Sequence, residues 1–566
     1  MEAPCECADQ FFNRYYANTI ASFISNKYPT IKSVFNKWSD TAKGKDSVAL
    51  LSNLQKNEDL KTALLLETPW VLEAKNETQQ KQNIAVLFNM VKISAEAGKA
   101  IQQLKEMQSV NGGFVWFKGG PDDRYITQYI LTGIGHLKKL GALTAANSAQ
   151  QNNLTIVINK AIPYLDKKIQ KDYEDLIKNK IKLINNNLTH TAIQYLYLRS
   201  FFTEIPVALG TQTAYTYYIS QAKKYWLNNN KYLQAMIALT LHRNQDNITP
   251  KAIMRSLKEN SINSETLGMY WKEWTVGGYR WQQAPIESQV LMIEAFTDID
   301  KNNTTINDLK TWLLQQKQTQ NWMTTRATAE ACYALLLNSG NWLTAEKAVT
   351  ITLGDISIRD FDSTAEAGTG YFKKVIDREK VNAAMGNIGV SVTTTKTDKT
   401  NRNNSNAWGA VYWQYFEDLD KTTTAVTPLQ LNKKLFVEKK SNTGPLLVEV
   451  ADGATLKIGD KVKVRILLKV DRDMEYIHMK DLRAACMEPI DILSAYKYQD
   501  GLGYYETTQD ASTSFFFSRL PKGNYVFEYP LFVTHTGNFS NGITTIQSNY
   551  APAFSSHSEG IRITVE

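Results

Sequence analysis

The spacing of hydrophobic residues changes close to residue 346 of this 566-residue chain, and this change constrains the fold more than any other feature. Before it, hydrophobic residues recur at i, i+3 and i+4, the pattern of half-buried helices. A clear example is the run Ile126, Tyr129, Ile130, Ile134 and Leu137. After it, from about Val349, they alternate with polar residues, as in strands. The sequence therefore predicts a helical part followed by an all-β part.

The helical part contains a weak internal repeat. Helices are expected over 10–26, 84–107, 122–137, 149–164, 171–184, 189–202, 211–226, 231–243, 249–259, 286–297, 304–316, 325–338 and 343–347. Three tryptophans each precede a polar turn and a helix with a hydroxyl residue near its start; the pairs are Trp116 with Thr127, Trp281 with Ser288, and Trp322 with Thr328. Repeated helical hairpins of this kind can close into an α/α toroid, and an open solenoid is the alternative. The closed ring is favoured because the helical part has the length of one large domain.

The β part contains many short strands separated by Gly, Asn and Asp turns, which favours β-sandwiches. Strands are expected over 349–358, 388–395, 462–470, 514–518, 525–529, 532–535 and 560–565. The segment 397–406 is predicted to be an exposed loop, and 439–444 a linker. The sequence thus predicts a multidomain α plus all-β protein, with an α/α toroid over 1–346 and two β-sandwich domains over 347–440 and 441–566.

Composition excludes several classes of protein. The 64 Lys and Arg against 56 Asp and Glu give a weak bias of +8 without a dense basic block, so no nucleic-acid partner is expected. Four cysteines are too few for a disulfide scaffold. The longest apolar runs fall short of the roughly 18–20 residues of a membrane span. No signal peptide is evident, and the abrupt start suggests a piece of a longer protein.

The densest chemical motif is the segment 5–10, Cys-Glu-Cys-Ala-Asp-Gln, just ahead of the first helix. Cys7 and Gln10 stand at i and i+3, positions that a helical turn brings together. The sulfur could attack the Gln10 carbonyl and expel ammonia, leaving an internal thioester that acylates amines once exposed. A lone Cys-x-x-Gln is common, however. Cys5 and Cys7 could instead form half of a metal site, but no matching ligand pair occurs, so no metal or cofactor is expected.

The residues around this motif resemble bacterial alpha-2-macroglobulins. Segments 4–10 and 13–18 are similar to the thioester motif of that family, 110–117 and 123–129 to the second signature of its thioester domain, and 322–336 to that domain's last inner helix. Segment 407–416 resembles the CUB-type β domain, and 475–489, 503–505 and 527–529 resemble the C-terminal macroglobulin domain. The resemblance covers essentially the whole chain, and the family fold at its start is an α/α toroid.

The resemblance implies a covalent protease trap, not an enzyme. In the family, an attacking protease cuts a bait segment and is then acylated by the exposed thioester through its lysine amines. The bait is expected to lie outside this chain. The implied partners are proteases, and the implied location is the periplasm or cell envelope. The full-length parent is expected to be a monomer that a lipid can anchor to a membrane.

Two departures from the family pattern concern the site itself. Asp9, the acid of the motif, replaces the usual Glu, and Cys5 replaces part of an aromatic turn as a second thiol that could compete. Complement-type relatives carry a His after the Gly-Gly-Phe segment that steers transfer to hydroxyls. Residues 112–125 contain none; their ionisable groups are Lys118, Asp122, Asp123 and Arg124. The resemblance therefore implies a preference for amines.

A thioester lasts only where water is excluded, so an aromatic pocket is expected around it. Candidates from the motif segments are Trp116, Phe117, Tyr15 and Tyr125, and the resemblance adds Tyr504 and Tyr505 from the last β domain. For each of them, ordinary hydrophobic core is the alternative.

Two rival hypotheses remain open. One is a polysaccharide lyase or hydrolase on an α/α toroid, which would need an acidic or Tyr/His cluster in the ring mouth; none is clear, and HExxH, GxSxG and Walker A motifs are absent from the sequence. The other is a scaffold without a thioester. Asp471, Asp473 and Asp481 could suggest a cation site, although local ion pairs explain them as well. His478 shows no partner in the sequence.

Overall fold

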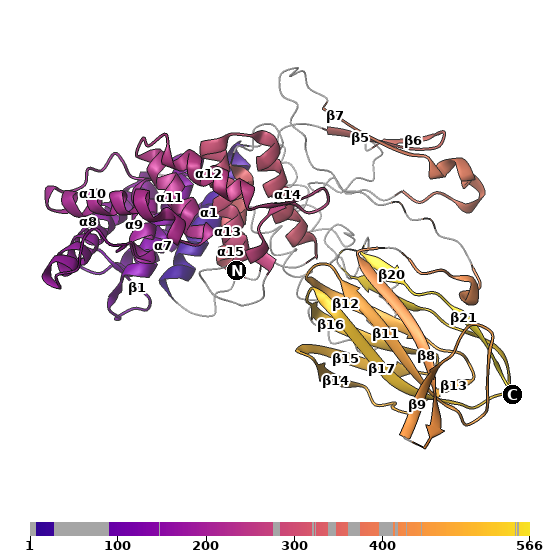
Figure 1. Ribbon diagram of the computed structural model, residues 1–566. Helices are drawn as coiled ribbons and strands as arrows, with labels where there is room; N and C mark the ends of the chain where they lie inside the picture. Colours follow the sequence, from indigo (N-terminus) through magenta and orange to yellow (C-terminus); the bar gives the residue numbers. More distant parts are fainter. Residues whose placement is uncertain are drawn as a thin grey trace. The chain divides into compact units, whose positions relative to one another are not determined.

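The computed structural model describes residues 7–27, 90–145, 148–275, 284–319, 322, 324–337, 347–359, 374–394, 411, 413, 417–425, 427–442, 444–549, 551 and 554–566. They fall into two compact units (Figure 1). One holds the helices and a small three-stranded sheet, and the other holds the remaining strands of the C-terminal part. The predicted order of a helical part and then a β part is confirmed. The predictions for Trp281, 343–346 and 397–406 lie outside the described residues.

The helices of the described part follow the predicted hydrophobic stripes. They are α1 (Ala8–Lys27), α6 (Met90–Glu106), α7 (Arg124–Leu140), α8 (Ser148–Lys178), α9 (His190–Arg199), α10 (Leu209–Tyr225), α11 (Lys231–Arg243), α12 (Thr249–Glu259), α13 (Pro285–Ala295), α14 (Asn303–Thr319) and α15 (Thr325–Leu336). One prediction was wrong: 149–164 and 171–184 are not two helices, because α8 runs unbroken as far as Lys178 with Pro163 inside it. Buried Leu165 and Ile169 continue its apolar stripe past the proline, so packing keeps the helix intact.

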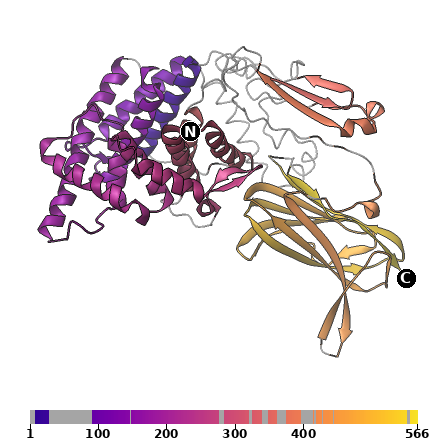
Figure 2. The ribbon, with the colours of Figure 1, turned by 45° about the horizontal axis from the view of Figure 1, so that its top comes forward.

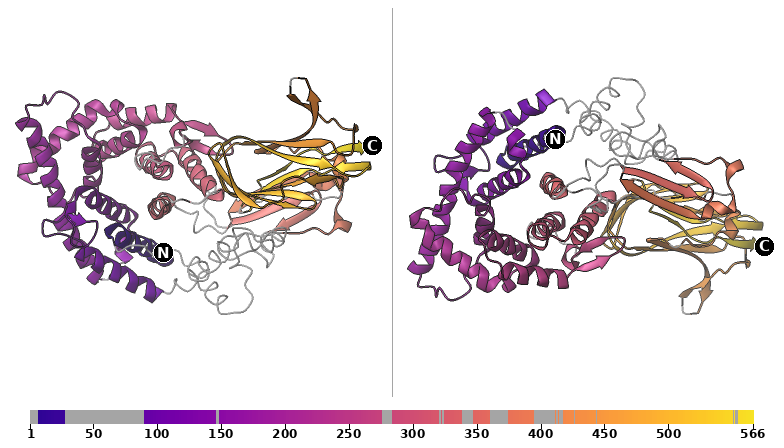
Figure 3. Two further views of the ribbon diagram at one scale, coloured as in Figure 1. Left: turned by 90° about the horizontal axis from the view of Figure 1, so that it is seen from below. Right: turned by 90° about the horizontal axis from the view of Figure 1, so that it is seen from above.

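Helix contacts within the first unit follow a cyclic order. α1 contacts α7, α7 contacts α9, α9 contacts α11, α11 contacts α13, α13 contacts α15, and α15 contacts α1 again. α6 packs on α1, α8 on α7, and α12 on α11. Figure 3 shows these helices arranged around a common centre. Their shared core includes the fully buried Ile130, Ile134, Ile193, Leu239 and Ile293.

The first unit also carries strands. β1 (Phe114–Val115) pairs with β2 (Asp122–Asp123), and β3 (Ile262–Ser264) pairs with β4 (Gly268–Tyr270). β5 (Lys347–Leu353) lies between β6 (Ile356–Arg359) and β7 (Ile388–Thr394). The segment predicted over 349–358 corresponds to β5 and β6, joined by the Gly354-Asp355 turn, and the strand predicted from residue 388 corresponds to β7.

The second unit consists of sheets (Figure 2). Its strands are β8 (Leu429–Ser441), β9 (Gly444–Glu449), β10 (Ala454–Leu456), β11 (Lys461–Val470), β12 (Met474–Leu482), β13 (Met487–Pro489), β14 (Ala495–Gln499), β15 (Leu502–Gln509), β16 (Ser512–Leu520), β17 (Gly523–Val533), β18 (Gly537–Asn541), β19 (Thr544–Ser548), β20 (Ser555–His557) and β21 (Ile561–Val565). A five-stranded sheet has the order β13-β17-β11-β8-β9, a six-stranded sheet β14-β15-β16-β12-β19-β20, and a three-stranded sheet β10-β21-β18. Alternating side chains of β8, β11 and β12 are buried, so each strand turns one face to a common core.

Two predictions in the β part were wrong. The expected linker over 439–444 is a hairpin, in which Ser441 of β8 pairs with Gly444 of β9. Because β8 pairs with β11 from Leu429 to Val437, this sheet begins before the predicted boundary at 440/441. The strands expected over 525–529 and 532–535 are one strand, β17, whose Pro530 stands opposite Lys463 without ending the pairing with β11.

Candidate functional site

The thioester-like motif lies at the start of α1 and is held there by the Gly-Gly-Phe segment. The backbone of Cys7 forms an antiparallel bridge with Phe117, and the Ala8 N–H donates to the Trp116 carbonyl oxygen at 3.1 Å. The Cys7 carbonyl accepts the first helical hydrogen bond from the Phe11 N–H at 3.1 Å. The two segments that carry the sequence resemblance are therefore side by side.

The three motif residues differ in burial. Cys7 is 4% exposed, whereas Asp9 and Gln10 are half-buried in the first turn of α1. Cys7 directly precedes α1, and Gln10 lies three positions later in its first turn. Burial raises the pKa of Asp9, and its Oδ1 has no hydrogen-bond partner among the described residues.

The sulfur of Cys7 takes part in a disulfide bond, whereas Cys332 and Cys486 are free. A sulfur in a disulfide cannot attack an amide carbon, because the thiolate is the nucleophile. A thioester at Cys7 therefore requires the reduced chain. Cys5, the second thiol of the motif, lies outside the described residues.

The two glycines before Phe114 are required by close packing against α8. Gly112 has φ +95°, and a Cβ there would lie 2.1 Å from the carbonyl oxygen of Lys160. A Cβ on Gly113 would lie 2.6 Å from the Tyr164 ring. Only glycine allows the loop to approach this closely, and the approach places the following segment beside α1.

The start of α7 fixes the other side of this loop. Asp123 caps the helix, and the Thr127 hydroxyl donates to the Asp123 carbonyl oxygen at 2.6 Å and accepts from the Phe114 N–H at 2.8 Å. Arg124 forms an ion pair with Asp172 at 2.6 Å. Asp123 and Arg124 are thus committed to local structure, and no histidine stands in this loop to act as a base.

The aromatic residues of the motif segments lie in different environments. The rings of Trp116 and Tyr125 stack, with centroids 6.1 Å apart and an interplanar angle of 18°, and both are half-buried. Tyr15 on α1 is 1% exposed, and burial raises its pKa to about 12. Phe117 is 58% exposed. Trp116 and Tyr125 therefore form a stacked pair, and the backbone of Trp116 is bonded to Ala8 at the start of α1.

The two tyrosines expected from the β part lie on β15 in the second unit. Tyr504 is buried, and its ring packs against those of Phe515, Phe517 and Phe527. Tyr505 is half-buried and packs on Tyr496, with ring centroids 5.0 Å apart. The position of Tyr504 is thus explained by the core of its own unit.

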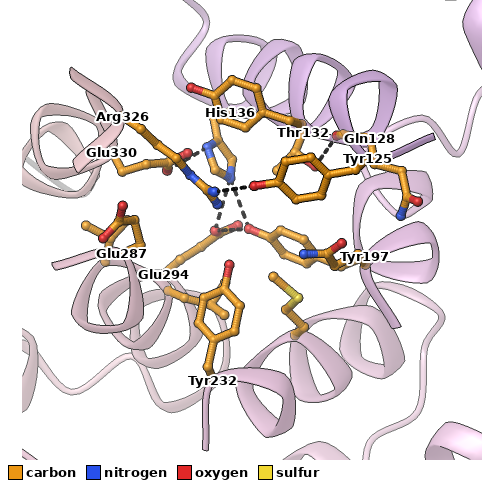
Figure 4. A pocket seen from close by; sticks show the side chains of 15 residues that line it. Tyr125, Gln128, Thr132, His136, Tyr197, Tyr232, Glu287, Glu294, Arg326 and Glu330 are labelled. Atoms are coloured by element: carbon orange, nitrogen blue, oxygen red, sulfur yellow. Dashed lines mark hydrogen bonds and ion pairs between the residues drawn. The ribbon is translucent and has the colours of Figure 1, made fainter. Parts of the chain in front are cut away.

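The first unit also encloses a polar cavity that the sequence did not reveal (Figure 4). Its volume is about 40 Å³. It is lined by Tyr125, Gln128, Tyr129, Thr132, His136, Gln194, Tyr197, Tyr232, Met236, Glu287, Val290, Leu291, Glu294, Arg326 and Glu330. These residues come from α7, α9, α11, α13 and α15, so no short motif could mark them. The one signal for them in the sequence was that polar residues recur among the small and apolar residues of the inner helices.

Charged side chains in and beside this cavity are paired with one another. Glu294 is fully buried and contacts Arg243, Lys139 (3.3 Å) and His136 (3.7 Å). His136 Nδ1 also lies 3.1 Å from Glu330. Burial alone would raise the pKa of Glu294, but Lys139 and Arg243 hold it below its ordinary value. The carboxylate is therefore charged, and its ion pairs connect α13 to α7 and α11.

The residues considered for a cation site form other interactions. Asp471 is paired with Arg472, Asp473 accepts from the Lys522 N–H at 2.8 Å, and Asp481 is paired with Lys433. Among the described residues, no cluster of His, Cys, Asp or Glu could hold a metal ion. No helix in the part of the chain that the structure describes has the length and hydropathy to cross a membrane.

The second unit gives the comparison with known families. Residues 429–553, which begin at the first residue of β8, match the family model of the bacterial alpha-2-macroglobulin MG10 domain. The chain carries a bacterial alpha-2-macroglobulin domain. This match confirms the family indicated by the sequence motifs. No curated protein sequence matches the chain.

Solved alpha-2-macroglobulins resemble the chain at low identity. Salmonella alpha-2-macroglobulin reacted with methylamine shows 14% identity and a TM-score of 0.32, over 84% of this chain and 28% of that one. Trypsin-activated alpha-2-macroglobulin from Escherichia coli shows 12% and 0.40, over 84% and 30%. The native E. coli protein from domain MG7 to its C-terminus shows 12% and 0.32, over 94% and 75%. This chain thus spans less than a third of the first two relatives.

Proposed function

We propose that this chain is the thioester-bearing part of a covalent protease trap, in which Cys7 and Gln10 form an internal thioester. The contact that carries the proposal is the backbone bridge of Cys7 with Phe117, together with the hydrogen bond from Ala8 to Trp116. It brings together the two segments that resemble a thioester domain, in a chain whose residues 429–553 match an MG10 domain. The cyclic order of α1, α7, α9, α11, α13 and α15 supports an α/α toroid for this part.

The chemistry needs no cofactor. In the reduced chain, the Cys7 thiol loses its proton and its sulfur attacks the side-chain carbonyl carbon of Gln10; the C–N bond breaks, and the nitrogen takes up a proton and leaves as ammonia. A lysine amine of a protease later attacks the same carbon, forms an amide, and releases the Cys7 thiol. The low exposure of Cys7 and the stacked rings of Trp116 and Tyr125 support exclusion of water from the acyl group.

The loop after Gly113 supports amines as the acceptors. A hydroxyl is a poor nucleophile unless a base removes its proton, and a histidine is the usual base near neutral pH. Residues 112–125 contain none. A primary amine needs less help, so the trap would acylate lysines in preference to serine, threonine or sugar hydroxyls.

The partners and the location are proposed by analogy with the relatives. Two of the solved E. coli structures are alpha-2-macroglobulins activated by elastase and by trypsin. By extension, the partners proposed here are proteases, and the location is the periplasm or cell envelope. The segment expected over 347–440 is proposed to contribute the CUB-like domain, and the segment expected over 441–566 the terminal macroglobulin domain. Because β8 pairs with β11 from Leu429, the proposed start of the terminal domain moves from 441 to Leu429 or earlier.

A second candidate, a binding scaffold without a thioester, is favoured by one observation, the disulfide bond at Cys7. A toroidal polysaccharide lyase or hydrolase gains no support from the polar cavity, which measures about 40 Å³ against the roughly 300 Å³ or more of ordinary ligand pockets, and whose buried Glu294 is already paired with cations. A second pocket of the helical unit, of about 340 Å³, is lined by residues that include Lys231, Glu273 and Trp274, and Lys231 and Glu273 are paired with each other.

The proposal is tested by acyl transfer. The chain, reduced with a phosphine that cannot cleave a thioester by exchange, is incubated with a fluorescent primary amine and, separately, with active-site-blocked trypsin. A denaturant-resistant adduct mapped to Gln10, absent in Cys7→Ala, is expected. A matched fluorescent alcohol should give far less. If the amine label fails to appear, or appears equally in Cys7→Ala, the trap is refuted and the scaffold remains.

A further inference from the structure

We infer that Arg326 is a positioning residue for the proposed thioester, because it connects the stacked pair of Trp116 and Tyr125, which is bonded to the backbone next to Cys7, to the last inner helix. The inference rests on the proposed function. Arg326 lies in the first turn of α15, far from the motif in sequence, and its side chain points into the polar cavity with Tyr125 and Glu330 (Figure 4).

One branch of contacts runs from Arg326 to the residue after the motif cysteine. Arg326 Nη1 donates to the Tyr125 hydroxyl at 2.9 Å. The Tyr125 ring stacks on Trp116, and the Trp116 carbonyl oxygen accepts the Ala8 N–H at 3.1 Å. Since Ala8 follows Cys7 directly, this branch connects the guanidinium to the backbone of the motif.

A second branch reaches α1 one turn further on. The Arg326 guanidinium lies 5.0 Å from the centre of the Tyr129 ring, and the Tyr129 hydroxyl donates to Asn13 Oδ1 at 2.6 Å. Asn13 Nδ2 in turn donates to the Thr325 hydroxyl at 3.4 Å. Thr325 is the neighbour of Arg326, so this branch returns to α15. Together the branches hold α1, α7 and α15 in one arrangement around the motif.

Arginine suits this position better than lysine. A planar guanidinium can donate along its edge and stack its face on a ring at the same time, whereas an ammonium is a point charge without a face. The charge is balanced nearby, because Glu287 and Glu330 line the same cavity. Glu287 is mostly buried, and its burial raises its pKa while Arg326 opposes the rise.

Loss of either branch should loosen the stacked pair of Trp116 and Tyr125 without removing it. With Tyr125 released, the Trp116 ring loses its stacking partner, and water gains access to the acyl group beside Cys7. The expected effect is faster spontaneous hydrolysis of the thioester. A charged hydrogen bond has the strength to change such a rate by about tenfold.

The experiment measures how long the thioester survives in amine-free buffer. Wild-type chain, Arg326→Lys and Tyr125→Phe are prepared with a phosphine reductant, and intact mass follows the species that lacks one ammonia as it converts to the hydrolysed form. Both variants should lose the thioester at least about tenfold faster than wild type. Tyr125→Phe removes a single oxygen, so it keeps the test open if the arginine variant misfolds.

A matched control separates positioning from general stability. Arg199 is also buried, donates to the carbonyl oxygens of Phe202 and Ile205 at 2.7 Å, and takes no part in either branch. Arg199→Lys should lower the melting temperature and leave the hydrolysis rate unchanged. If wild type carries a thioester and both test variants hydrolyse at its rate, the role of Arg326 is overturned. If wild type carries none, the proposed function itself fails, and the inference with it.

Discussion

Replacing Glu294 with Gln tests whether the ion pairs of this buried carboxylate stabilise the packing of the inner helices. Glu294 on α13 is fully buried and contacts Lys139 of α7 and Arg243 of α11. The substitution keeps the shape and removes the charge. It leaves Lys139 and Arg243 to share the single carboxylate of Asp298 among their described ion pairs. Breaking a buried ion pair by removing one partner costs about 3–5 kcal/mol, so Glu294→Gln should lower the free energy of unfolding by about 3 kcal/mol or more.

The pH dependence carries the same information. The pKa of Glu294 in the folded chain lies below its ordinary value of 4.5. The unfolded chain therefore binds the proton more readily than the folded chain does. The stabilisation is fully present above about pH 4.5 and is lost as the pH falls below it. Glu294→Gln should remove this part of the acid sensitivity.

The assay is urea unfolding followed by far-ultraviolet circular dichroism, because the helices dominate that signal. Glu204→Gln is the matched control. Glu204 pairs with Lys138 on the same unit, but its side chain is 56% exposed, and exposed pairs contribute only about 0–1 kcal/mol. If the free energy of unfolding of Glu294→Gln lies within about 1 kcal/mol of the wild-type value, as expected for the control, the ion pairs of Glu294 do not stabilise the helical unit as described.

Three further predictions concern single contacts. Gly112→Ala places a Cβ 2.1 Å from the Lys160 carbonyl oxygen at a positive φ, which costs at least about 1–2 kcal/mol; urea unfolding measures this, and an unchanged stability would contradict the packing argument. Burial lowers the pKa of His478 to about 4, so stability should fall by about 3 kcal/mol as the pH drops from 6.5 towards 4; His478→Phe should flatten this slope in pH-dependent unfolding, and an unchanged slope would refute it. Lys433→Met leaves Asp481 buried without its cation and should cost about 3–5 kcal/mol, most of which Lys433→Met with Asp481→Leu should restore; thermal unfolding that shows no recovery would contradict the pairing.

The spacing of hydrophobic residues predicted the helices and strands of this fold, because burial of one face of each element determines which of its residues are apolar. It was misled where packing or pairing overrides a local signal. Two helices were expected over 149–164 and 171–184, yet the buried stripe on either side of Pro163 keeps α8 continuous. The polar segment 439–444 suggested a linker, yet it is the turn between β8 and β9, since exposed hairpin turns and linkers share the same composition.

The candidate site could be predicted only in part. Cys7 and Gln10 are close in sequence, so their chemistry can be inferred from spacing alone. The bridge from Cys7 to Phe117 needs the tertiary fold, and so does the reason for Gly112. The ion pair between Lys139 and Glu294 joins residues 155 positions apart, a separation at which no spacing rule applies. The resemblance to a family supplied what spacing could not, namely that the two segments belong together.

The central claim is that Cys7 and Gln10 close into a thioester, and the intact mass of the reduced chain tests it most directly. The reduced chain should have a mass lower than that of the sequence by one ammonia, with no reactive thiol at Cys7. Methylamine should then add to Gln10 and release that thiol. A mass that equals the unmodified sequence after reduction, unchanged by methylamine, would contradict the account. A loss of two hydrogens before reduction, and nothing more, would show that the disulfide is the only bond that Cys7 forms.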